Sequence, residues 1–126
     1  MITLITPPDI FENENLSLVF MNISDQEQED ASLWLSNNNI DKNINLYYYQ
    51  GETNIPWLLH AVAISKGVYL NCNNNSDVTK WITSFILSKS NVWYKSEDAN
   101  LSALMSYINQ KPVKNIKEFL EVHLGK

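Results

Sequence analysis

Residues 67–95 read GVYLNCNNNSDVTKWITSFILSKSNVWYK and carry the clearest structural pattern in the chain. Residues 68–72 form an apolar run of strand length, and residues 73–75 are three consecutive asparagines, which favour a loop. Residues 77–89 place apolar side chains at helical spacing, and residues 91–94 have the β-branched and aromatic composition of a second strand. This order of elements predicts a parallel β-α-β unit.

The preceding part of the chain repeats this pattern. Residues 16–23 (LSLVFMNI) and 44–49 (INLYYY) are predicted strands. The first is nearly continuously apolar, which is typical of a parallel strand covered on both faces. Ser24 and Glu27 have the spacing of a capping box, which predicts a helix after the first of these strands. A second helix is predicted to begin at Asn54, because a proline follows in its first turn.

Strands that alternate with helices predict an α/β fold, and more specifically a flavodoxin-like three-layer fold with a mainly parallel sheet of four to five strands in the order 2-1-3-4. Residues 2–6 are predicted to be an edge strand or an arm, because the nine residues before the next strand are too few for a parallel crossover. We therefore expect one domain over residues 1–126. It would comprise an N-terminal strand or arm (1–15), a β-α core (16–95) and C-terminal helices (96–126).

Composition excludes several classes of protein. The chain has a net charge of −5, and all nine of its basic residues are lysines. Arginine is the usual partner of phosphates and base edges, so this acidic chain is not expected to bind nucleic acid. It has no apolar run of membrane length and no secretory signal, which predicts a cytoplasmic protein without membrane contact. A single cysteine excludes an internal disulfide and a Cys-rich zinc site, and we expect no metal and no cofactor.

The loops after the predicted strands are the expected ligand site. In open α/β sheets, ligands bind beyond the carboxyl ends of the strands, where the strand order reverses. The amide, hydroxyl and carboxylate side chains of these loops can hydrogen-bond a small molecule. The candidate ligand-binding residues are Asn22, Ser24, Asp25, Gln50, Asn73, Asn75 and Ser76. The alternative interpretation is that the asparagine loop only turns the chain and caps the next helix.

The other reactive side chains fit packing roles better than chemical ones. The chain has three glycines, which are too few and too scattered for a phosphate-binding loop. His60 and His123 lie in predicted helices without a partner spaced for a metal, so both are predicted to pack or to face solvent. Cys72, at a strand end, is predicted to be a small core residue. The acidic residues that follow Ser24 are interpreted as a helix cap and a solvated face.

Three local strings, in this order of elements, resemble the nucleoside 2-deoxyribosyltransferase-like family. They are residues 18–25 (LVFMNISD), residues 54–59 (NIPWLL) and residues 76–92, and the overlap covers roughly residues 16–95. The resemblance implies the family's fold and a nucleotide pocket. The nucleophilic glutamate of the family would fall at about Trp81 or Ile82, where this chain has no acid.

The missing glutamate argues against glycosyl transfer, which needs a carboxylate to form or stabilise the sugar intermediate. Asp77 is the nearest carboxylate and the one catalytic candidate, although its position fits a helix cap. The string ITPPD (residues 5–9) and the asparagine-rich, arginine-free composition also resemble small proteins of large contractile-tailed phages. That resemblance implies the cytoplasm of a bacterial host.

These observations lead to a main hypothesis and an alternative. The main hypothesis is a non-catalytic, phage-type α/β domain that binds a protein partner or is a subunit of a homo-oligomer. The alternative is a protein that binds a nucleoside or nucleotide. It would be either an enzyme that transfers or hydrolyses an N-glycosidic bond, with Asp77 and Asp25 replacing the missing acid, or a sensor without turnover.

Overall fold

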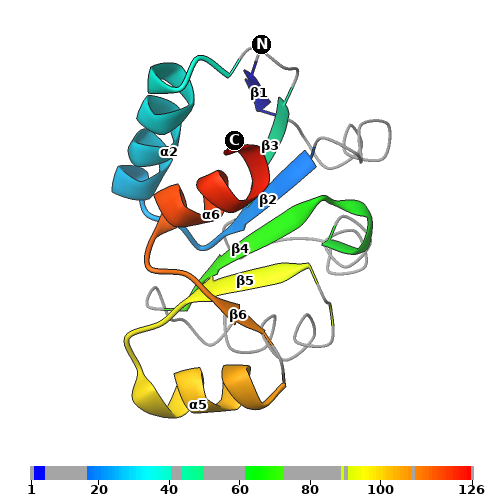
Figure 1. Cartoon of the computed structure of the whole chain (residues 1–126), viewed down its shortest axis with the longest axis vertical. Coiled ribbons are helices and arrows are strands. Elements are labelled where there is room, and N and C mark those ends of the chain that lie inside the picture. The colour runs from blue at the N-terminus through cyan, green and yellow to red at the C-terminus, as the bar shows by residue number, and fades with distance from the viewer. Residues whose placement is uncertain are drawn as a thin grey trace.

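The computed structural model describes residues 2–4, 17–40, 44–49, 62–72, 89, 91–108 and 110–125. Residues 54–61 of the helix predicted to begin at Asn54 lie outside these ranges, and so does all but residue 89 of the helix predicted over residues 77–89. Within the described residues, helices lie against the two faces of a twisted parallel sheet (Figure 1). The amino-terminal strand and the end of the last helix lie toward the same end of the molecule.

Six strands form one sheet in the described part of the chain, and every neighbouring pair is parallel. They are β1 (Ile2–Leu4), β2 (Ser17–Met21), β3 (Ile44–Tyr49), β4 (Gly67–Asn71), β5 (Val92–Lys95) and β6 (Lys111–Pro112). The strand order is β1-β3-β2-β4-β5-β6. Its β3-β2-β4-β5 portion is the predicted 2-1-3-4 order, and β6 extends this to the flavodoxin-like order 2-1-3-4-5. The predicted α/β fold is therefore confirmed.

Short strands at both edges make the sheet larger than the predicted four to five strands. β1 pairs with β3, beginning at the partners Ile2 and Ile44. β6 has two residues, of which one is Pro112, and no pattern in the sequence indicated it. A proline is tolerated there because one side of an edge strand has no neighbouring strand, so the missing N–H of proline removes no hydrogen bond on that side. The next residue continues the contact, since the Val113 N–H donates to the Tyr94 carbonyl at 2.9 Å.

The sheet separates two hydrophobic clusters. Alternate residues of a strand point to opposite faces, so Val19 and Met21 of β2 join one cluster while Leu18 and Phe20 join the other. The first cluster includes Met105 of α5 (Ala99–Tyr107). The second includes residues of α2 (Asp25–Asn37) and α6 (Ile116–Leu124). These helices thus complete the predicted three layers.

Each of these helices begins at a polar residue that accepts a hydrogen bond from the backbone three residues later. Ser24 caps α2, where the complete capping box is present, so this detail of the prediction is confirmed. Asp98 caps α5 and Asn115 caps α6, each with an N–H···O distance of 3.0 Å. Caps of this kind satisfy donors that a helix cannot satisfy itself and are worth about 1 kcal/mol each. None of the described helices has the length and apolar character needed to cross a membrane.

The spacing of Leu101, Leu104, Met105 and Ile108 predicts one apolar stripe for α5, and the helix packs differently. Met105 is buried and Leu101 and Ile108 are partly buried against the first cluster, at the spacing i, i+4 and i+7. Leu104 was expected on the same face, yet it is 49 % exposed. One residue turns a helix by about 100°, which places Leu104 at the border of the buried face. An apolar side chain of α5 is therefore left in solvent.

Candidate functional site

The carboxyl ends of β2 and β4 lie next to each other at the point where the strand order reverses. Met21 of β2 is paired with Leu70 of β4, and each is followed directly by an asparagine, Asn22 and Asn71. Both asparagine side chains are buried, with exposures of 8 % and 6 %. Asn22 has a φ of 58°, a left-handed conformation that asparagine adopts at lower cost than most residues. The chain thereby turns from β2 into α2 at the carboxyl edge of the sheet, where a ligand is expected. We call this edge the carboxyl rim.

Glu27, in the first turn of α2, reaches back to this rim. Its Oε2 accepts a hydrogen bond from the Tyr69 hydroxyl at 2.7 Å, and its Oε1 accepts one from the Asn71 side-chain amide. Oε1 also accepts from the Ser24 backbone N–H at 3.2 Å. One carboxylate therefore joins the start of a helix to the neighbouring strand.

This carboxylate is buried and well supplied with donors. Glu27 is only 9 % exposed, and burying a charge is costly unless hydrogen bonds replace the lost water. Groups of three residues, Ser24, Tyr69 and Asn71, donate to it, which meets that requirement. Burial and the hydrogen bond to Glu27 raise the pKa of Tyr69 far above its ordinary value, so the hydroxyl remains a donor at neutral pH. The hydrogen bonds to Glu27 thus form a structural tie, because they hold the start of α2 against β4.

The structure places part of the predicted ligand site at this rim. Asn22 is buried beside the Glu27 network, while Ser24 caps α2 and is exposed. Asp25 is exposed in the first turn of α2. The remaining predicted site residues lie outside the described part of the chain: Gln50, Asn73, Asn75, Ser76 and Asp77. Whether Asp25 and Asp77 converge therefore stays a prediction.

The sequence interpretation did not anticipate Glu27, Tyr69 and Asn71 as one network. Glu27 was assigned to the helix cap, which is right, and to a solvated acidic face, which its burial corrects. Tyr69 and Asn71 are two residues apart in β4, so both point to the same face of the sheet. The sequence did contain a signal for this network. It was the presence of two side chains that can hydrogen-bond on one face of an otherwise apolar strand.

Cys72 and His123 occupy the packing positions predicted for them. Cys72 is 1 % exposed, and burial raises the pKa of its thiol to about 12, so it is not a thiolate at neutral pH. The His123 ring lies between Trp93 and Phe119, with ring centroids 4.4 and 4.6 Å away. Within the described residues, no group of three or more His, Cys, Asp or Glu side chains is placed to hold a metal ion.

We expect His123 to make the stability of the fold depend on pH. Burial, with Lys66 and Lys111 nearby, lowers the pKa of His123 from 6.5 to about 4. The unfolded chain therefore binds a proton between these values that the folded chain does not, and stability should fall as pH falls from about 6.5 to 4. The ring is only partly buried, so solvent screening limits the loss to about 1–2 kcal/mol.

Urea unfolding at pH 7, 5.5 and 4.5 measures this loss. Carboxylates also titrate in the lower part of this range, so His123→Leu provides the comparison. The variant should lose about 1–2 kcal/mol less than the wild type between pH 7 and 4.5. Equal losses in both proteins would mean that His123 is not the responsible group.

Comparison with protein-family models gives no match for this sequence, and comparison with curated proteins gives none either.

Proposed function

We propose that this chain is a non-catalytic α/β domain that acts by protein–protein contact, with α5 as the contact surface and a second copy of the chain as the partner. The observation that carries the proposal is the exposed, uncharged face of α5. The network at the carboxyl rim supports its non-catalytic part, because the one buried carboxylate among the described residues there, Glu27, is held by donors from α2 and β4.

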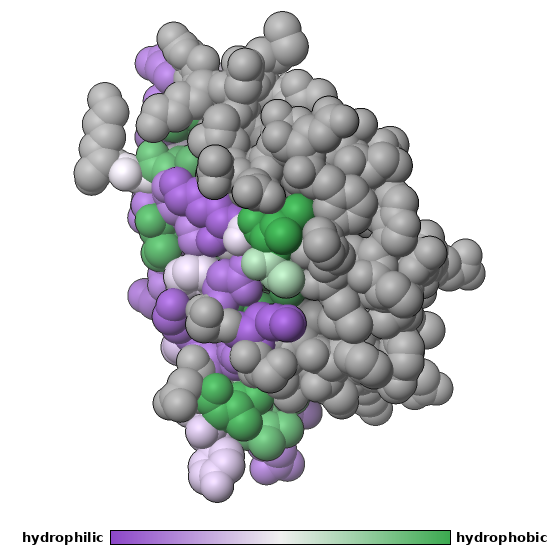
Figure 2. Space-filling view, turned by 90° about the vertical axis from the view of Figure 1, so that its right-hand side faces the viewer, coloured by the Kyte–Doolittle hydropathy of each residue, from purple (hydrophilic) through white to green (hydrophobic). Residues whose placement is uncertain are grey.

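The outward face of α5 is unusual for a surface helix. Tyr107 is 84 % exposed and Leu104 is 49 % exposed, and Ala103 on the same side is exposed as well. The nine residues of α5 include no charged side chain. A solvent-facing helix normally carries charged residues on its outer side, and exposed apolar patches with a tyrosine are typical of interfaces. Figure 2 shows a hydrophobic patch near the lower end of the molecule, at the height of α5 in Figure 1.

Charge favours a second copy as the partner. Each chain carries a net charge of −5, so two copies repel each other unless they meet through a neutral surface. The face of α5 is neutral. A two-fold axis beside this helix would place α5 against α5, so that Leu104 and Tyr107 of one copy cover those of the other without burying like charges. The face is thus suited to self-association.

Size-exclusion chromatography with light scattering tests the proposal. The wild type should show about twice the 14.5 kDa mass of one chain at ~100 μM protein. The double variant Leu104→Lys and Tyr107→Lys should be a monomer, because it places four cations in the contact. Val122→Lys, at a 55 % exposed position of α6, is the matched control and should keep the dimer. A wild type that is a monomer at this concentration would refute self-association through α5.

In this proposal, the chain descends from the nucleoside 2-deoxyribosyltransferase-like family that it resembles. A phage-encoded chain in the host cytoplasm would keep the parallel sheet and lose the catalytic glutamate, as the residues at 81 and 82 suggest. The alternative, nucleoside or nucleotide binding, is supported by the position of Asn22 and Asn71 at the carboxyl ends of neighbouring strands, where the strand order reverses. A thermal-shift screen with nucleosides separates the two, since a ligand of the native state raises the melting temperature.

A further inference from the structure

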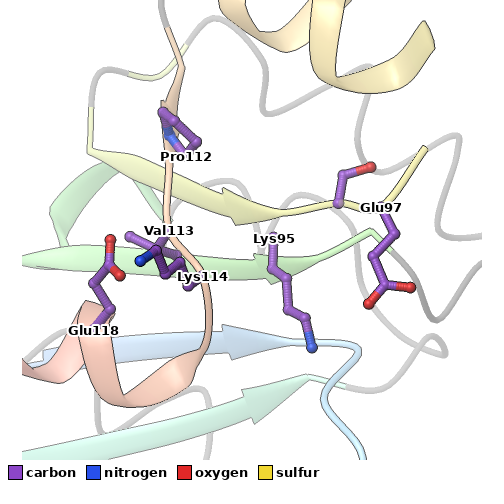
Figure 3. Close-up of a pocket in the computed structure, with 7 residues that line it drawn as sticks. Lys95, Glu97, Pro112, Val113, Lys114 and Glu118 are labelled. Carbon is purple, nitrogen blue, oxygen red and sulfur yellow. The ribbon is translucent and has the colours of Figure 1, made fainter. Parts of the chain in front are cut away.

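A hollow lies at the same carboxyl end of the sheet as the Glu27 network, beyond the last strands. It has a volume of about 460 Å³ and is open to solvent. It is lined by the end of β5 and the two residues after it, the end of β6, the connection to α6 and the first turn of α6, as Figure 3 shows. The carboxyl edge of an open α/β sheet is where small molecules bind in such folds, and the volume lies in the range of small-molecule sites.

The lining combines an apolar surface with charges of both signs. Pro112 and Val113 supply the apolar part. Lys95 and Glu97 come from the β5 side, and Lys114 and Glu118 come from the connection into α6 and its first turn (Figure 3). In the part of the chain that the structure describes, neither lysine ammonium group has an ion pair or a hydrogen bond. Two cations and at least one unengaged carboxylate, that of Glu118, therefore face the hollow.

We propose that this hollow binds a small zwitterion of about dipeptide size, with a free α-ammonium and a free α-carboxylate group. A simple anion would meet Glu97 and Glu118, and a simple cation would meet the two lysines, so either would have like charges opposite it. A zwitterion can pair with both. Its carboxylate is suited to Lys114, which lies just before the amino-terminal end of α6, where the helix dipole also favours negative charge. The site is separate from the α5 surface and does not depend on the proposed self-association.

Isothermal titration with four probes tests the chemistry of the ligand on the full chain. The probes are the dipeptide Ala-Leu, its N-acetyl form, its C-terminal amide and inorganic phosphate. Ala-Leu should bind, and blocking either end should weaken binding by about fivefold, the factor expected for the loss of one solvent-exposed ion pair. Phosphate should bind more weakly than Ala-Leu. No binding of Ala-Leu at 10 mM, or tighter binding of phosphate, would overturn the proposal.

Two variants locate the binding, and the fold should tolerate both, because Lys114 is exposed and Glu118 is partly exposed. Lys114→Gln should weaken binding of Ala-Leu by about fivefold but leave binding of the amide unchanged, because the amide has no carboxylate to lose. Glu118→Gln should weaken binding of Ala-Leu but not of the N-acetyl form. Lys117→Gln and Glu121→Gln, on α6 but outside the hollow, are the matched controls. The same losses in the controls would place the binding elsewhere and overturn the assignment.

Discussion

Replacing Glu27 by alanine should lower the free energy of unfolding by about 3–5 kcal/mol. The change leaves the buried Tyr69 hydroxyl and the Asn71 amide without the acceptor they share. The loss of a hydrogen bond to a buried, charged acceptor costs about 1–3 kcal/mol for each donor. The capping interaction with Ser24 is lost as well, which adds up to about 1 kcal/mol. Urea unfolding at pH 7 measures the sum.

The neighbouring acid of the same helix supplies the control. Glu29 is exposed in α2, so Glu29→Ala should change stability by less than about 0.5 kcal/mol. Tyr69→Phe should cost about 1–2 kcal/mol, because it removes one donor and leaves a charged acceptor with its other partners. If Glu27→Ala cost no more than Glu29→Ala, the network would not be the tie between α2 and β4 that the geometry indicates.

The arrangement of the sheet could be predicted because it follows from local patterns in the sequence. β2 and β4 are apolar runs in the sequence with polar residues beyond their ends, and Ser24 with Glu27 has a spacing that specifies a helix start. These patterns use only neighbouring residues. β6 could not be predicted in the same way, because a two-residue strand with a proline is too short to show the alternation of apolar and polar side chains that indicates a strand. It forms only because β5 offers a free edge at that place.

The site was less predictable than the fold because it depends on distances between remote residues. Glu27 and Tyr69 are 42 positions apart, and only the parallel pairing of β2 with β4 brings them together. The same holds for the hollow between β5 and α6, whose lining comes from two segments. Residue type indicated that the loops are polar, but it did not indicate which carboxylate is buried and which, like that of Asp25, remains in solvent.

Gly67 provides the second large effect, and its role also depends on a remote partner. Gly67→Ala should lower the free energy of unfolding by about 3 kcal/mol. A Cβ at this position would lie 2.5 Å from Cε1 of His123 and closer still to Nε2. The His123 ring cannot easily yield, because Trp93 and Phe119 enclose it. The structure shows Gly67 as the first residue of β4, in close contact with α6.

A double-mutant cycle separates this steric clash from any backbone effect. The backbone at Gly67 does not have a positive φ, so alanine is compatible with it and would otherwise stabilise the chain slightly. His123→Ala removes the ring that the new Cβ would meet. Gly67→Ala should therefore cost about 2 kcal/mol less in the His123→Ala background than in the wild type, a coupling typical of residues in direct contact. Equal costs in both backgrounds would show that the glycine is needed for a reason other than the close approach of His123.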